Sequence, residues 1–177
     1  MAGGCKEVSR RGVRGRTILI FVTVGSMFPF DRLIKAIDEQ VAAGQIVEEV
    51  VAQIGSGSYE PQSIKFERFM EKAEFESLLG AADVVVSHAG IGSIATALNL
   101  GKPMLVLPRL KRYGEHVNDH QVATARKYQE LGHVMVADEE TDLPHMLTRI
   151  REFTPVPRHI NVEGLVNRIG RYLSTIG

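Results

Sequence analysis

Short apolar runs that alternate with segments of helical pattern constrain the fold of this chain more than any other feature. The run Asp-Val-Val-Val at 83–86 would be apolar on both sides of a strand, as expected in the middle of a sheet covered by helices on each face. Comparable runs recur along the chain, and helix-length segments separate them. Because parallel neighbours need such crossovers, the pattern predicts an α/β fold with a doubly wound, mostly parallel, Rossmann-like sheet.

The periodicity also gives expected bounds for each element. The expected strands are 18–24, 47–54, 63–69, 84–87, 104–107 and 133–137. The expected helices are 30–43, 74–82, 93–100, 118–131, 143–153 and 162–173, with Ser93 as the N-cap of the third helix.

Length and composition limit the class of protein. At 177 residues we expect a single domain over 17–177, preceded by a disordered basic tail at 1–16. Contact of that tail with anionic lipid is the alternative. Basic and acidic residues are balanced at 21 each, so we expect no nucleic-acid partner. The single cysteine and the lack of an apolar run of about 20 residues predict a cytoplasmic chain that does not cross a membrane.

In a parallel sheet, ligands bind beyond the carboxyl ends of the strands. This rule collects four loops on one edge, at 24–26, 55–58, 88–93 and 108–121.

The loop at 88–93 has the composition of a phosphate site. A helix N-terminus offers unpaired N–H groups and about half a positive charge, and glycines there let an anion come close. Gly90, Gly92 and Ser93 fit this description, and Gly25 with Ser26 offers a second loop, so we expect a diphosphate. The alternative is that the glycines serve only turns and packing. His88 either binds the ligand or hydrogen-bonds its own loop.

Other nucleotide sites fit the sequence poorly. A dinucleotide site needs G-x-G-x-x-G after the first strand, and an ATP site needs glycine followed by Lys-Ser or Lys-Thr. Neither pattern is present, so we expect no NAD, no ATP and no other cofactor.

The loop at 108–121 concentrates groups that could bind a sugar. It holds three cations and a series of hydrogen-bonding side chains, namely Glu115, His116, Asn118, Asp119, His120 and Gln121. The alternative is a solvated loop in which Asn118 or Asp119 caps the following helix. His116 and His120 stand one helical turn apart beside Glu115, but no third ligand has useful spacing, so we expect no metal site.

Five segments together resemble the C-terminal, nucleotide-sugar-binding domain of glycosyltransferase family 28. They are 21–26 (FVTVGS), 30–33 (FDRL), 82–93 (ADVVVSHAGIGS), 101–103 (GKP) and 118–121 (NDHQ). The resemblance covers 18–131 and implies the C-terminal lobe of a GT-B fold with a UDP-sugar donor. The segment 114–121 is most similar to PssE-type subunits of exopolysaccharide synthesis, and Alg-type small subunits and the MurG enzyme are related.

The resemblance also implies roles for individual residues. Gly25, Ser26, Gly92 and Ser93 would contact the diphosphate, beside His88 and Gly90, and Met70 and Lys72 would border the uracil. Thr96 takes the position where many family members have a glutamate that holds the ribose, and it can make only one neutral bond there. His120 and Gln121 would face the transferred sugar, and Glu115 and His116 are further candidates for setting which sugar is accepted. Asn118 is a further candidate substrate-binding residue, and Glu115, His116 and His120 are the candidate catalytic residues.

A GT-B enzyme closes two lobes around its substrates, and this chain has residues for one. The resemblance therefore implies a separate membrane-anchored, acceptor-binding subunit of PssD or Alg type, which holds this chain at the inner face of the membrane. An isolated chain could pair with a copy of itself instead. Two further classes stay open: a non-catalytic nucleotide-sugar sensor, and a stand-alone UDP-sugar hydrolase or epimerase.

Overall fold

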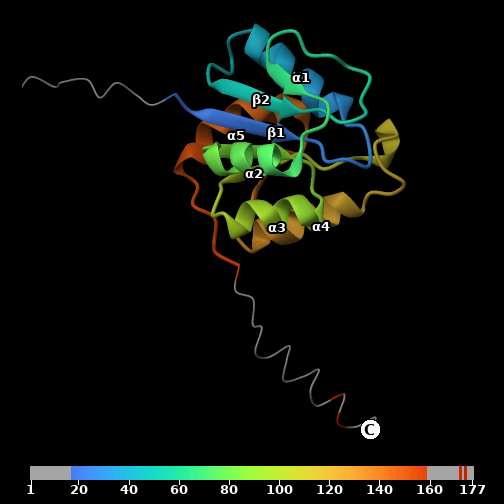
Figure 1. The fold of residues 1–177 in the computed structure, drawn as a ribbon. Coiled ribbons are helices and arrows are strands. Elements are labelled where there is room, and N and C mark those ends of the chain that lie inside the picture. Colours follow the sequence, from blue (N-terminus) through green and yellow to red (C-terminus); the bar gives the residue numbers. More distant parts are fainter. Residues whose placement is uncertain (1–16, 159–171, 173, 175–177) are drawn as a thin grey trace, which may run out of the picture.

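A six-stranded sheet forms the centre of the molecule (Figure 1). The computed structural model describes residues 17–158 together with Tyr172 and Ser174. The expected tail at 1–16 and, apart from Tyr172, the expected helix at 162–173 lie outside these residues. The strands follow the order β3-β2-β1-β4-β5-β6, and every pairing is parallel. The predicted α/β class and doubly wound parallel sheet are confirmed.

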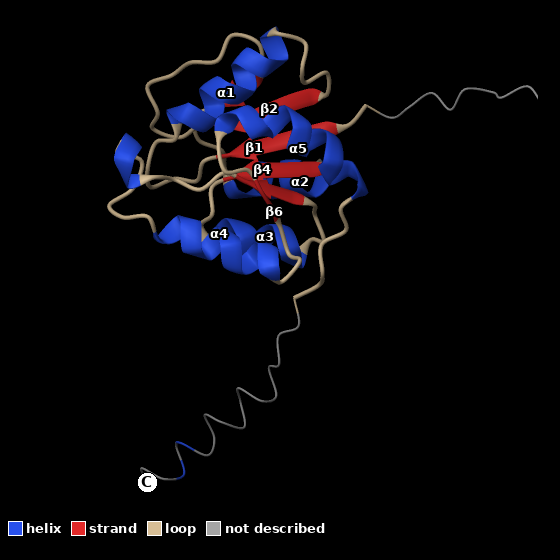
Figure 2. Cartoon of the chain, turned by 180° about the vertical axis from the view of Figure 1, so that it is seen from behind, coloured by secondary structure: helices blue, strands red, loops and turns tan. Residues whose placement is uncertain are grey.

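The element bounds are close to those expected (Figure 2). The strands are β1 Leu19–Thr23, β2 Glu49–Gln53, β3 Lys65–Glu67, β4 Val84–Ser87, β5 Met104–Val106 and β6 Met135–Val136. The α-helices are α1 Asp31–Ala42, α2 Lys72–Ala81, α3 Ile91–Asn99, α4 His120–Glu130 and α5 Leu143–Arg149. Short 3-10 turns are η1 Lys111–Tyr113, η2 Glu140–Asp142 and η3 Ile150–Glu152.

Helices cover both faces of the sheet and create two apolar clusters. Ile20 and Val22 of β1 point into one cluster with side chains of α1 and α5, whereas Phe21 points into the other with side chains of α2, α3 and α4. Figures 1 and 2 show these helices on opposite sides of the strands. Because successive side chains of a strand alternate between faces, an all-apolar run such as Val84–Val86 is needed wherever both faces are covered.

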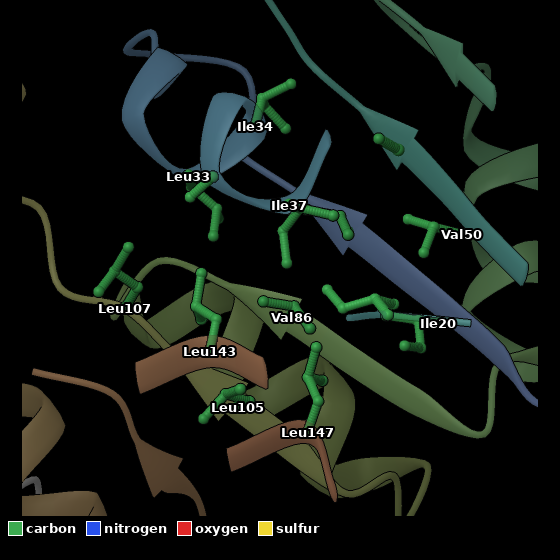
Figure 3. Packing of buried hydrophobic residues seen from close by; sticks show 14 of the residues in the cluster. Ile20, Leu33, Ile34, Ile37, Val50, Val86, Leu105, Leu107, Leu143 and Leu147 are labelled. Carbon is green, nitrogen blue, oxygen red and sulfur yellow. The ribbon is translucent and has the colours of Figure 1, made fainter. Parts of the chain in front are cut away.

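The spacing of apolar residues along α1 explains how this helix packs on one face of the sheet. Leu33, Ile34 and Ile37 recur at intervals of three and four residues and are fully buried against the sheet (Figure 3). Burying each such side chain contributes roughly 1.5–3 kcal/mol. Leu143 and Leu147 of α5 complete the same cluster.

Several boundaries differ from the expected ones by two residues or more, among them three helix ends. The start of α3 is Ile91, with Gly90 at the N-cap position, so Ser93 lies inside the first turn and the expectation that it caps the helix was wrong. The expected helix at 118–131 begins at His120, and the one at 143–153 ends as an α-helix at Arg149 before η3.

The strand order fixes where a ligand can bind. From β1 the chain continues to β2 and β3 on one side of the sheet, and from β4 it continues to β5 and β6 on the other side. The loops that follow the neighbouring strands β1 and β4 therefore lead away from each other at the carboxyl edge of the sheet. Such a switch point is the usual ligand position in doubly wound sheets. None of the helices in the described part of the chain is long and apolar enough to cross a membrane.

Candidate functional site

Two adjoining cavities open at the carboxyl ends of β1 and β4. The first, of about 380 Å³, is lined by Val24, Gly25, Ser26, Met27, Phe28, His88, Gly90, Gly92, Ser93, Arg109, His116, His120 and Gln121. The second, of about 240 Å³, is lined by Thr23, Gly25, Ser26, Gln53, Phe69, Met70, Phe75 and Ser93. We call these two cavities the cleft. No Asp or Glu side chain lines it among the described residues, so its electrostatic character suits an anion.

The N-terminus of α3 opens onto the cleft. Gly90 occupies the N-cap position and no side chain caps the helix, so the first N–H groups have neither a helical partner nor a cap. A Cβ built on Gly92 would meet no atom within 4 Å, so packing does not require glycine at this position. A phosphate can come close to unpaired N–H groups where no side chain covers the backbone beside them.

His88 is held as a neutral hydrogen-bond donor. The Gly90 N–H donates to its Nδ1 at 2.9 Å, so the proton of the neutral ring is on Nε2, which lies 3.3 Å from Ser93 Oγ. Burial lowers the pKa of His88 to about 3, with smaller contributions from the charges of Arg109 and His116. A Cβ on Gly90 would lie 2.2 Å from the ring, so Gly90 also serves packing, as the alternative reading of the loop anticipated.

The depressed pKa of His88 gives an expected dependence of stability on pH. Above pH about 6.5 the ring is neutral in both states and has no effect. As pH falls from about 6.5 toward the folded value of about 3, the unfolded chain binds a proton that the folded chain excludes, so stability is lost. Between pH 7 and pH 5 we expect His88 to contribute about 2 kcal/mol of this loss. Urea unfolding at both pH values should show a smaller loss in His88→Asn, and equal losses would contradict the assignment.

Hydrogen bonds with Gln53 of β2 hold the β1–α1 loop in place. Gly25 has a positive φ of 72°, and its N–H donates to Gln53 Oε1 at 3.2 Å. Thr23 Oγ1 donates to the same oxygen at 2.8 Å, and Gln53 Nε2 donates to the Gly25 carbonyl at 3.2 Å. Gly25 lines the cleft, but its amide is used in these internal hydrogen bonds. Gln53, which is 5% exposed, is a site residue that we did not anticipate.

Gln121 joins three parts of the cleft. Its Oε1 accepts hydrogen bonds from the backbone N–H groups of Ala89 and Arg109, both at 3.1 Å. Its Nε2 lies 3.5 Å from His88 Nδ1. The side chain is only 3% exposed, so it fixes the loops after β4 and β5 relative to α4.

His116 and His120 form an aromatic wall of the cleft. Their ring centroids are 4.5 Å apart in an edge-to-face arrangement, and Phe28 packs on His116 at 5.0 Å. Burial, followed by the neighbouring His120 and Arg109, lowers the pKa of His116. No group of three or more His, Cys, Asp or Glu side chains suited to a metal occurs within the described residues.

Asn118 and Asp119 organise the start of α4. The N–H of His120 donates to Asn118 Oδ1 at 3.2 Å, and the His120 ring contacts the same oxygen. Asp119 Oδ1 accepts from the Lys111 N–H at 2.7 Å. Asn118 does not line the cleft. Asp119 holds the N-cap position of α4 but makes no side-chain cap hydrogen bond, so the expected alternative of a capping side chain was also wrong.

Glu115 is the expected catalytic residue that the structure places elsewhere. Its side chain is directed to Arg32 in a bidentate ion pair, with Nε–Oε1 at 2.7 Å and Nη2–Oε2 at 3.0 Å. The Leu110 N–H donates to Oε2 at 2.8 Å, and Glu115 is 7% exposed. Arg32 also pairs with Glu140 and donates to the Pro108 carbonyl. The structure therefore does not bring Glu115 to the cleft, because both oxygens are bonded elsewhere, and its catalytic role stays a prediction.

Of the three residues expected at the uracil and the ribose, the structure brings one to the cleft. Met70 lines the cleft beside Phe69 and Phe75. Lys72, at the start of α2, has a side chain that is 88% exposed beside Glu76, and it does not line the cleft. Thr96 is one turn past Gly92, and its hydroxyl donates to the Gly92 carbonyl at 2.9 Å. Neither Lys72 nor Thr96 is brought to the cleft.

Arg109 lines the cleft. The rule that ligands lie beyond strand ends selected its loop at 108–121, in which Arg109 is one of the three cations, but the sequence assigned this residue no individual role.

Comparisons with known proteins point to one family. The family model "Glycosyltransferase family 28 C-terminal domain" matches residues 19–157. A human protein named UDP-N-acetylglucosamine transferase subunit ALG13 is 32% identical over 124 residues, which is 65% of this chain and 10% of that protein. A Geobacillus kaustophilus protein named UDP-N-acetylglucosamine–N-acetylmuramyl-(pentapeptide) pyrophosphoryl-undecaprenol N-acetylglucosamine transferase is 40% identical over 67 residues, 38% of this chain and 18% of that protein.

Solved structures show the same fold. The NMR structure of ALG13 has a TM-score of 0.54 at 22% identity and covers 86% of this chain and 94% of its own. The kitacinnamycin glycotransferase has a TM-score of 0.58 at 22% identity, over 83% of this chain and 39% of that one. Because the family match spans nearly the whole described sheet and its helices, the chain belongs to glycosyltransferase family 28, whose C-terminal domain it contains.

Proposed function

We propose that this chain is the donor-binding subunit of a two-component UDP-sugar glycosyltransferase that acts in lipid-linked glycan synthesis. The observation that carries the proposal is the uncapped N-terminus of α3, with Gly92 bare beside a cleft that no described carboxylate lines. The diphosphate of the donor would bind there, and Met70, Phe69 and Phe75 would contact the base in the second cavity.

The proposed reaction is displacement at the anomeric carbon with inversion. An acceptor hydroxyl forms the new glycosidic bond as the bond from that carbon to the outer phosphate oxygen breaks. Negative charge then grows on the departing UDP. N–H groups at the start of α3 and the Nε2–H of His88 are positioned to stabilise it.

A second chain is proposed to supply the acceptor site and the general base. Glu115 is committed to Arg32, and His88 is neutral with Nδ1 already accepting a bond from Gly90, so these two groups are poor bases. The human relative is named a transferase subunit, which supports a heteromeric enzyme. We further propose that the partner is membrane-anchored and that the glycan is an exopolysaccharide, since the segment 114–121 resembles PssE-type subunits.

A transfer assay tests the proposal. The chain is expressed alone and together with an acceptor-lobe chain that carries one membrane helix, taken from the same genome. Membranes are incubated with a panel of labelled UDP-sugars, and label in lipid-linked product is measured. We expect product only when both chains are present, and binding of UDP by the isolated chain in calorimetry.

The outcomes separate the competing functions. UDP binding without transfer by the pair would favour a regulatory nucleotide-sugar sensor. Hydrolysis or epimerisation by the isolated chain would favour a stand-alone enzyme. Absence of UDP binding would overturn the proposed donor site itself.

A further inference from the structure

Arg109 is a buried cation at the wall of the cleft. The residue is 2% exposed, and Nη2 donates to the carbonyls of Val24 at 2.7 Å and Phe28 at 2.6 Å. Its guanidinium lies 5.0 Å from the Phe30 ring centroid. Arg109 thus holds the β1–α1 loop from the side of β5.

The guanidinium has donors left over. Nε is fully buried and has no hydrogen-bond partner among the described residues. The hydrogen bonds of the guanidinium to the described residues all come from Nη2, so Nη1 is also left over, and Arg109 is one of the residues that line the first cavity. A buried charge without a partner is strongly unfavourable.

Glu115 does not form an ion pair that would compensate this charge. Glu115 raises the pKa of Arg109 through its charge, but both its oxygens are bonded to Arg32. Burial lowers the pKa of Arg109 to about 10, so the side chain is still a cation at neutral pH. No ion pair joins Arg109 to a carboxylate in the described part of the chain.

A second unsatisfied atom belongs to another residue that lines the same cavity. His116 Nδ1 is buried and also lacks a partner among the described residues. Two unsatisfied polar side chains that line one cavity, which Gly90 and Gly92 also line, indicate a ligand rather than a packing defect.

We propose that Arg109 binds an anionic oxygen of the nucleotide-sugar donor through Nη1. The inference rests on the proposed function and extends it, because it gives the cleft a fixed side-chain cation in addition to backbone N–H groups. The anion is either the outer phosphate or a carboxylate on the transferred sugar, since both present the same charged oxygen to a guanidinium.

The test compares ligands that differ by one anionic group. Affinities of UDP and UMP, and of UDP-hexose and UDP-hexuronate, are measured by calorimetry for the wild type, Arg109→Gln and Arg109→Lys. We expect Arg109→Gln to reduce the UDP-to-UMP affinity ratio at least tenfold if the phosphate is the ligand. If the sugar carboxylate is the ligand, the hexuronate-to-hexose ratio should fall instead. Arg109→Lys, which keeps the charge, should lose less.

Arg112→Gln is the matched control. It removes one positive charge from the same loop, but Arg112 is exposed and pairs with Glu139 outside the cleft, so both ratios should stay as in the wild type. Ratios are used because they do not depend on the folded fraction of a variant.

Three results would decide against the proposal. If Arg109→Gln leaves both ratios unchanged while the wild type binds UDP, the role of Arg109 is overturned and the donor site stands. If the wild type binds no UDP, the proposed function fails as well. Should the variants not fold, NMR on the wild type replaces them: the Arg109 Nε–H signal should shift with UDP or UDP-hexuronate but not with UMP, and no shift with any ligand refutes the contact.

Discussion

Glu115→Ala should lower the free energy of unfolding by about 3 kcal/mol, because it leaves Arg32 buried with its bidentate partner removed. The side chains of Arg32 and Glu115 are 11% and 8% exposed. In this variant Glu140 would still pair with Arg32, at 2.9 Å in the wild type. The expected loss of unfolding free energy is therefore at the lower end of the range for breaking a buried ion pair. Urea unfolding of the two proteins measures the difference.

The control is an ion pair of the same charge type on the surface. Lys35 and Glu39 lie one helical turn apart on α1 with a 3.7 Å separation, and both side chains are more than half exposed. Glu39→Ala should therefore change stability by less than about 1 kcal/mol. If Glu115→Ala instead abolished sugar transfer at unchanged stability, Glu115 would act in catalysis, as its sequence context predicted.

Gly92→Leu should reduce the affinity for UDP at least about tenfold without destabilising the protein. A Cβ at this position enters open space on the cleft, so a leucine side chain would occupy the room proposed for the diphosphate. Leucine also has a helix propensity better than that of glycine by roughly 1 kcal/mol, which favours folding. Calorimetry with UDP and thermal unfolding together separate the two effects.

Gly80→Leu is the matched control for this variant. Gly80 is also helical, in α2, and a Cβ there also meets no atom within 4 Å, but Gly80 does not line the cleft. Its UDP affinity should equal that of the wild type. Unchanged UDP binding in Gly92→Leu would remove the main support for a phosphate at the start of α3.

The sequence predicted those features that depend on local pattern. All-apolar runs such as Val84–Val86 can be buried only in a covered sheet, and the strand-end rule brought Gly90, Gly92 and His116 to one edge. The start of α3 was missed because serine is the commoner cap. Here the amide of Gly90 is bound by the His88 ring, so the helix begins at Ile91.

Long-range polar pairs could not be predicted in the same way. Arg32 and Glu115 are 83 positions apart, and nothing in the local sequence of Glu115 distinguishes a buried structural carboxylate from a catalytic one. Gln53 likewise looks like an ordinary strand end until β2 is placed beside β1, where its amide binds Thr23 and Gly25.

The alternation of β1, β4 and β5 side chains between two apolar clusters has an evolutionary consequence. The sheet separates the helices on its two faces, and buried side chains of α1 and of α3 belong to different clusters. The effects of substitutions in α1 and in α3 on the free energy of unfolding should therefore add. Two substitutions within one cluster should instead show epistasis. Lineages could then remodel either flank separately while the ligand-facing edge keeps its shape.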